Sequence, residues 1–245
     1  MPIQQMFLGA GGAAPLGDLP VTSNLRWYHD AYFFSPTQWD DLSGNGYHRT
    51  TSGSTMGSSI SQHDVLPGTN YMTKHRKYIQ NDNVNHGVKW QGTGLWPGST
   101  YTLMHICARQ DNTEGRIVDG HGMNFLSGFH GSLEGVFYHN AWILNTNLDS
   151  RTNFLVSIDR RQKVRSKGLS HSGGGVDSGY VSGSGSSPTA SAGIGIGSGT
   201  YTGDIDSSGG ENCNWKCIMI ACWSDEKSDS DCNTLMDWGY DALYG

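Results

Sequence analysis

The chain has 245 residues, of which 35 are glycine, 11% are aromatic and 16% are charged. This length suits one all-β domain with an arm, and abundant glycine with tryptophan and tyrosine favours short strands joined by turns over a helical bundle. The formal net charge of −6 is a weak argument against a nucleic-acid-binding protein. The five cysteines, without a secretion signal, indicate buried thiols rather than disulfides.

The first twenty residues are apolar at the start and rich in glycine and proline afterwards. The apolar side chains of this stretch are those of Ile3, Met6, Phe7 and Leu8. Residues 1–20 contain no Lys or Arg, so no secretory signal peptide is predicted, and no later window resembles a membrane span. We therefore expect residues 1–24 to form an assembly arm that becomes ordered only on a partner, and residues 25–245 to form the folded domain.

Short apolar segments then follow one another, each bounded by Gly, Asn or Asp. Residues 101–109, YTLMHICAR, and 217–225, CIMIACWSD, are apolar on both faces, which is typical of strands buried on both sides. Residues 152–160, TNFLVSIDR, alternate with period two, as a half-buried strand does. Between them, residues 170–193 are low-complexity Gly and Ser, which predicts a surface loop. The predicted core residues are Leu103, Ile106, Val156, Ile158, Ile218 and Ile220.

The last eighteen residues change period. Apolar or small residues recur at helical spacing at Cys232, Leu235, Met236, Gly239 and Leu243. A serine at 228 or 230 can cap a helix, and the acids that follow suit the positive end of its dipole. A short amphipathic helix is therefore predicted to close the chain.

Three stretches, taken in order, carry a resemblance: WDDLSGNGYH at 39–48, IDRRQKVRSKGL at 158–169, and the terminal block 217–245. Their order resembles that of the laminin-G-like, concanavalin-A-like jelly rolls, in which a last core strand ends in an acidic turn followed by a short helix. The resemblance implies an all-β, two-sheet antiparallel jelly roll with a short C-terminal helix and an extended N-terminal arm.

The start of the chain, MPIQQMFLGAGG, resembles the N-terminus of structural proteins of marine bacteriophages, especially cyanophages. The resemblance implies a virion protein made in the host cytoplasm: a tail fibre, an appendage or a head decoration. Its arm would dock on other virion proteins, and its jelly roll would face solvent and bind host-surface glycan. A homo-oligomer, guessed to be a trimer, is expected, with no nucleic-acid or membrane partner.

Catalytic motifs are missing from the sequence. The E-x-D-x-x-E pattern of glycanases on this fold, the G-x-S-x-G elbow and the P-loop are all absent. We therefore expect a protein that is not an enzyme and carries no cofactor. Two alternatives stay open: a stand-alone carbohydrate-binding, lectin-like protein and a polysaccharide-degrading enzyme.

Three acids in one loop, Asp204, Asp206 and Glu211, are weak calcium candidates. A solvated acidic turn is favoured over calcium because no full ligand set is defined, so no metal is predicted. The turn at residues 41–46, DLSGNG, is likewise expected to be structural, because Asn-Gly supplies the backbone conformation that turns need.

A basic face and one tryptophan are the candidate contact residues for a second subunit or a glycan. Four cations alternate after residue 160 and would share one strand face: Arg161, Lys163, Arg165 and Lys167. The alternative is a solvated hairpin that protects a sheet edge. Trp96, on a Gly- and Pro-rich loop, either stacks on a sugar or plugs the end of the sandwich, and the plug is favoured.

Overall fold

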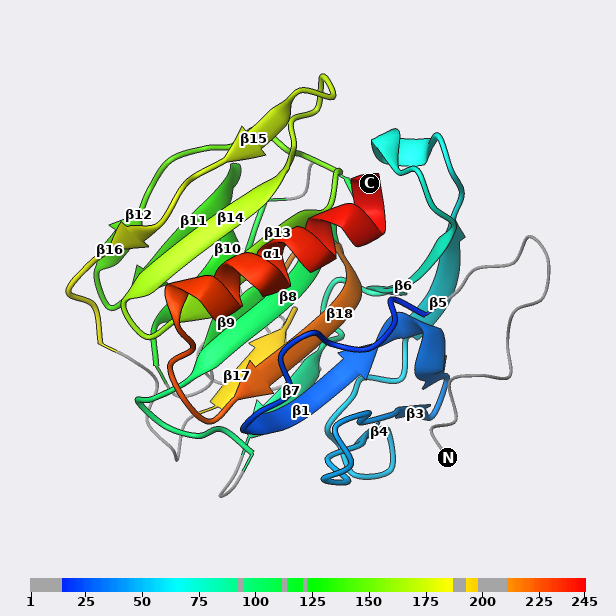
Figure 1. Cartoon of the computed structure of the whole chain (residues 1–245). Coiled ribbons are helices and arrows are strands. Elements are labelled where there is room, and N and C mark those ends of the chain that lie inside the picture. The colour runs from blue at the N-terminus through cyan, green and yellow to red at the C-terminus, as the bar shows by residue number, and fades with distance from the viewer. Residues whose placement is uncertain (1–14, 92–94, 112–113, 121–122, 187–192, 198–210) are drawn as a thin grey trace.

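The computed structural model describes residues 15–91, 95–111, 114–120, 123–186, 193–197 and 211–245 (Figure 1). Two antiparallel sheets pack face to face, and one helix, α1 (Asp229–Tyr244), lies across the outer face of the larger sheet. This architecture confirms the all-β, two-sheet fold with a C-terminal helix. None of the described helices is long and apolar enough to span a membrane.

The larger sheet has β8 and β18 at its centre. In spatial order its strands are β15 (Gly175–Asp177), β14 (Lys163–Leu169), β13 (Leu155–Arg160), β8 (Thr102–Arg109), β18 (Trp215–Trp223), β6 (Arg76–Asn81) and β5 (Ile60–Val65). Two further strands join it, β1 (Leu25–Asp30) on β18 and β16 (Val181–Ser182) on β14.

The second sheet covers the inner face of the first. Its strands, in spatial order, are β12 (Trp142–Leu144), β11 (Leu133–His139), β10 (Phe125–His130), β9 (Val118–Gly120), β17 (Gly193–Ile196) and β7 (Val88–Gln91). A small sheet and two 3-10 turns complete the described elements: β2 (Phe34–Ser35), β3 (Gln38–Trp39), β4 (Arg49–Thr50), η2 (Ala31–Phe33) and η3 (Thr69–Tyr71).

The larger sheet separates two apolar cores. Leu103 and Ile220 pack between the two sheets, whereas Ile106, Val156 and Ile218 pack on the opposite face, beneath α1. The six core residues predicted from the sequence are all buried. Because β8 and β18 carry apolar cover on both faces, their sequences are apolar at consecutive positions rather than alternating.

Helix α1 begins where the sequence predicts and is capped by Ser228 rather than by Ser230. The Ser228 hydroxyl accepts a hydrogen bond from the backbone N–H of Asp231, and the Asp231 carboxylate accepts one from the backbone N–H of Ser228. Gly239 allows the helix to approach the sheet closely. A Cβ atom there would lie 2.8 Å from Cε of Met104 and 3.0 Å from Cγ1 of Val156.

Two segments differ from the sequence expectation. Residues 15–24, assigned to the arm, begin to pack on the domain: Leu16 and Leu19 are buried in the core beneath α1. Residues 170–186, expected to form only a loop, contain the short strands β15 and β16, which both pair with β14. The apolar residues of the arm, Ile3, Met6, Phe7 and Leu8, lie outside the described residues.

Candidate functional site

Strand β14, which carries the basic face, lies beside α1 (Figure 1). Three side chains of the strand meet three of the helix, and the pairs are Lys163 with Asp229 (2.6 Å), Arg165 with Asn233 (2.8 Å) and Lys167 with Asp237 (2.8 Å). Two residues of a strand advance about 6.6 Å, and four residues of a helix advance about 6.0 Å. The spacing of side chains along the strand therefore nearly matches that along the helix, and the predicted basic face binds α1 of the same chain.

A second partner holds the middle cation. The guanidinium of Arg165 also donates to the carboxylate of Asp177, with an Nε–Oδ1 distance of 2.9 Å. The hydrogen bonds to Asp177 raise the pKa of Arg165 above its usual value. Contact of this face with another subunit or with a glycan stays a prediction. For such contact, the three cations would have to share or give up the side chains of α1 and β15 that they already bind.

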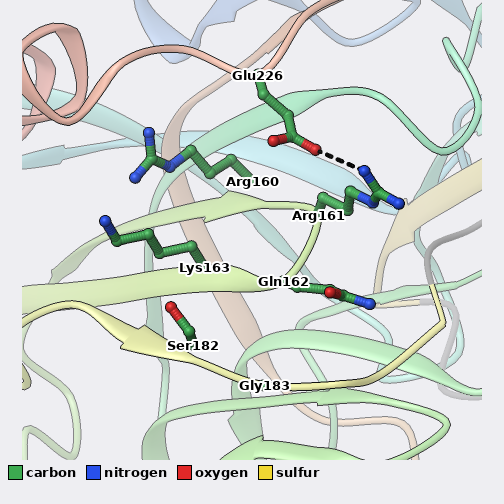
Figure 2. Close-up of a pocket in the computed structure, with 7 residues that line it drawn as sticks. All are labelled: Arg160, Arg161, Gln162, Lys163, Ser182, Gly183 and Glu226. Carbon is green, nitrogen blue, oxygen red and sulfur yellow. Dashed lines mark hydrogen bonds and ion pairs between the residues drawn. The ribbon is translucent and has the colours of Figure 1, made fainter.

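Arg161 is placed differently from the other three cations, and its side chain points toward Glu226 (Figure 2). It lies in the turn between β13 and β14, with φ of 52°, and half of its side chain is exposed. Its Nη1 is 3.4 Å from Oε1 of Glu226, in the loop between β18 and α1. This pair stands at the edge of a hollow of about 210 Å³, which we call the basic cleft, lined by Arg160, Arg161, Gln162, Lys163, Ser182, Gly183 and Glu226.

The remaining cations of the basic cleft are anchored. Arg160 is buried, and its guanidinium donates to the carbonyl oxygen of Lys227 and to the carboxylate of Asp229. Lys163 shares the same carboxylate. The two bonds together hold the pKa of Asp229 below its usual value. Arg160 and Lys163 therefore contribute positive charge to the cleft, and their contacts with the start of α1 fix their positions.

Three rings form a group on the outer face of the second sheet, which we call the aromatic platform: the exposed Trp142 and the half-buried Tyr138 and His130. The Trp142 side chain is 42% exposed. The ring of Tyr138 meets it edge-on at 5.1 Å and that of His130 at 5.5 Å between centroids. Strand alternation explains the exposure, because the neighbours of Tyr138 on β11 point into the molecule and Tyr138 points out.

The aromatic platform and one wall of the basic cleft contact strand β12 through different residues. Ile143, the residue after Trp142, packs against Gly183 so closely that a Cβ atom on this glycine would lie 3.0 Å from Cγ1 of Ile143. The Ser182–Gly183 wall of the cleft is thus seated on the strand that carries the exposed indole.

The other candidates from the sequence lie elsewhere. Trp96 is buried at 1% exposure, with its ring 4.6 Å from that of Tyr101, so it is a plug and is not available to stack on a sugar. Of the calcium candidates, Asp204 and Asp206 lie outside the described residues. Glu211 pairs with Arg116 at 2.7 Å and with His130 at 3.1 Å. Among the described residues, no group of three or more ligating side chains could hold a metal ion.

Another hollow, of about 550 Å³, is acidic and lies beside the predicted turn at residues 41–46. The carboxylate of Asp41 accepts backbone hydrogen bonds from Tyr28, Ser43 and Tyr47 at 2.9 to 3.0 Å. Burial raises the pKa of Asp41, but these bonds outweigh it and leave the pKa below its usual value. This acid therefore holds the turn together, as the sequence predicts.

No family model and no curated protein matches the chain. Solved structures do. Sialidase of Trypanosoma rangeli in complex with sialic acid matches with a TM-score of 0.50 and 11% identity over 90% of this chain and 33% of that chain. The same sialidase in complex with 2,3-difluoro-KDN matches with a TM-score of 0.51 and 12% identity over 96% and 35%. An arabinofuranosidase complexed with arabinofuranosyl-alpha-1,2-xylobiose matches with a TM-score of 0.47 and 13% identity over 84% and 50%.

These likenesses show the β-sandwich fold, and the chain spans about a third of the sialidase chains. The sialidase structures correct one expectation: the inference that the protein is not an enzyme is wrong, because this fold occurs in chains of sialidases, which are glycoside hydrolases. The absence of three sequence motifs excludes three kinds of active site and no more. The finer resemblances, to laminin-G-like domains and to cyanophage virion proteins, gain no support from these structures.

The sequence analysis missed the aromatic platform, and it did not show that Glu226 pairs with Arg161 within one chain. Tyr138 and Trp142 lie in one aromatic stretch, GVFYHNAWIL, where alternation alone could have placed Tyr138 opposite its buried neighbours. The bend between β11 and β12, which brings Trp142 beside Tyr138, carries no such signal. Glu226 belongs to an acidic turn that the sequence marks without showing which cation it meets.

Proposed function

We propose that this β-sandwich binds glycans on the outer face of its second sheet, with Trp142 as the stacking residue. The observation that carries the proposal is the exposure of a large indole, at 42%, in a chain whose other tryptophans are mostly buried. An exposed aromatic ring gains by covering its face with an apolar surface, and the C–H face of a pyranose offers one.

The neighbours of Trp142 suit the rest of a sugar. Edge-on rings on two sides fix the orientation of the indole, so little side-chain entropy would be lost on binding. The imidazole of His130 lies 3.1 Å from the Glu211 carboxylate, which is partly exposed. Imidazole and carboxylate together offer a donor and acceptors to sugar hydroxyls. A few polar groups around an apolar contact are typical of sites for small ligands.

The sialidase structures that share this fold support a carbohydrate-related role at the level of fold, and the ligands in their names belong to those proteins. The virion location, docking through Ile3, Met6, Phe7 and Leu8, and a homo-oligomer stay proposals from the N-terminal resemblance. The described residues neither add to them nor oppose them. Glycan binding would fit a virion protein that meets a host surface as well as it fits a free lectin-like protein.

The test is glycan binding by the full chain and by Trp142→Ala. Wild-type protein is screened on a glycan array, and the affinity for the best glycan is measured by calorimetry. The variant should lose about tenfold in affinity or more, because aromatic contacts contribute up to about 1.5 kcal/mol beyond burial. The control is Tyr71→Ala, which removes another exposed ring, 49% exposed and far from β12 in the sequence. Equal affinity of Trp142→Ala and wild type would refute the site, and absence of any glycan ligand would refute the function.

A further inference from the structure

We propose that the basic cleft binds the carboxylate of an acidic glycan, with Arg161 as its partner and Glu226 as an internal carboxylate that the ligand displaces. The inference rests on the proposed glycan binding and adds the substrate class. It comes from three observations: the charge balance of the cleft, the looseness of the Arg161–Glu226 pair, and the size of the hollow.

The charges around the cleft do not cancel. Its lining and the partners of that lining carry three cations and two carboxylates: Arg160, Arg161 and Lys163 against Glu226 and Asp229. Asp229 serves Arg160 and Lys163 together. Once a ligand carboxylate replaced Glu226 on Arg161, it would stand beside three cations. Such a site favours an anion over a neutral group of the same shape.

The pair that must open is weak. Nη1 of Arg161 and Oε1 of Glu226 are 3.4 Å apart, and the two side chains are 51% and 40% exposed. Strong pairs between guanidinium and carboxylate are shorter, at about 2.7 to 2.9 Å. Exposed pairs stabilise proteins little. The ligand can therefore replace Glu226 without disturbing the fold, whereas displacing Asp229 would release the start of α1.

The volume of the basic cleft indicates which part of a ligand it can hold. The cleft holds about 210 Å³, which is less than the 300 Å³ or so from which pockets for whole small molecules begin. It suits one charged group of a larger molecule whose remainder lies outside. The Ser182–Gly183 wall of the cleft packs against Ile143 of β12.

The rim of the cleft is held rigidly enough to be selective. The amide of Gln162 donates to the carbonyl oxygen of Gly185 at 2.7 Å, and the N–H of Gly183 donates to the carbonyl oxygen of Gln162 at 2.9 Å. These bonds fix the turn that presents Arg161. A planar guanidinium on a fixed turn recognises a carboxylate through two parallel hydrogen bonds, which a lysine in its place would not do.

The experiment compares acidic glycans with neutral twins. The probes are tetragalacturonate with its methyl ester and sialyllactose with lactose, titrated into wild type, Arg161→Gln, Glu226→Gln and Trp142→Ala at 50 and 300 mM NaCl. The matched control is Arg151→Gln. Arg151 is also an exposed arginine with a positive φ, of 49°, and it pairs with Asp149 at 3.2 Å at the other end of β13.

We expect wild type to bind an acidic probe at least fivefold more tightly than its neutral twin, with a smaller ratio at high salt. Arg161→Gln should bring that ratio close to one and leave the neutral affinity unchanged. Glu226→Gln should raise the acidic affinity threefold or more, since the competing carboxylate is gone. Arg151→Gln should behave as wild type.

Two failures are distinguishable. In the first case glycans bind through Trp142, but wild type shows no preference for acidic probes, or Arg161→Gln keeps that preference, or Glu226→Gln weakens acidic binding. Any of these results overturns the cleft assignment and leaves the proposed glycan binding in place. If neither acidic nor neutral probes bind and the array yields no ligand, the proposed function fails and takes this inference with it.

Discussion

Asp30 should make the protein less stable as the pH rises from about 4 to 7. Its carboxyl is buried at the end of β1 and accepts hydrogen bonds from the N–H groups of Leu16 and Tyr32, each at 2.8 Å. Burial raises the pKa of Asp30 from 3.8 to about 6, against the opposing effect of these two N–H groups and of Arg76. The acid therefore keeps its proton in the folded chain well above the pH at which the unfolded chain loses it.

The sign and size follow from linkage. Below about pH 4 both states hold the proton, and the favourable contribution of the protonated carboxyl is fully present. Between the two pKa values the unfolded chain binds fewer protons, so the free energy of unfolding falls as the pH rises. The whole effect is about 3 kcal/mol, because one pKa unit corresponds to about 1.4 kcal/mol. About 2 kcal/mol of it should fall between pH 4.5 and 7.5.

The assay is urea unfolding of wild type and Asp30→Asn at four pH values from 4.5 to 7.5. The variant cannot titrate at this position, so its stability relative to wild type should rise by about 2 kcal/mol across the range. Asp82→Asn, which removes an exposed carboxyl on β6–β7, controls for the loss of one surface charge. A difference between Asp30→Asn and wild type that stays constant over this pH range would refute the reasoning.

Two further predictions concern the backbone. Gly197→Ala should prevent folding, because φ is 69° and the new Cβ atom would lie 2.0 Å from Nε1 of Trp215. Soluble yield and near-UV circular dichroism would measure the loss of folded protein. The control is Gly175→Ala, whose new Cβ atom would meet nothing within 4 Å. A normally folded Gly197→Ala protein would contradict this packing. Ser228→Ala should cost about 1 kcal/mol in urea unfolding through loss of the α1 cap, and Ser230→Ala should cost clearly less; equal costs would place the cap elsewhere.

The sequence predicted the central strands and the helix because burial on both faces and helical period are local signals. Residues 101–109, 152–160 and 217–225 correspond to β8, β13 and β18 within a few residues. The split into two cores was not visible, because a run of apolar residues does not say which face meets a helix and which meets a sheet.

The candidate site was less predictable, since exposure and charge pairing depend on contacts that are distant in the chain. Trp96 and Trp142 are both tryptophans near turns, yet one is buried and the other exposed. The sequence likewise placed Lys163, Arg165 and Lys167 on one strand face correctly. Only the packing of α1 shows that this face is covered by the chain itself.

The geometry of that packing explains why Arg161 is the cation left for a ligand. A step of two strand residues exceeds a step of four helix residues by about 0.6 Å, so three successive pairs stay within reach of flexible side chains. The ladder must stop where the helix begins, at Asp229, and this residue already pairs with Lys163 and Arg160. One step further along the strand, the chain turns. Arg161 therefore lies beyond the N-terminal end of α1. Among the described residues its side chain pairs only with the loop carboxylate of Glu226, at 3.4 Å. The charge of an arginine in that position is not required for folding, so the side chain can pair with a ligand instead.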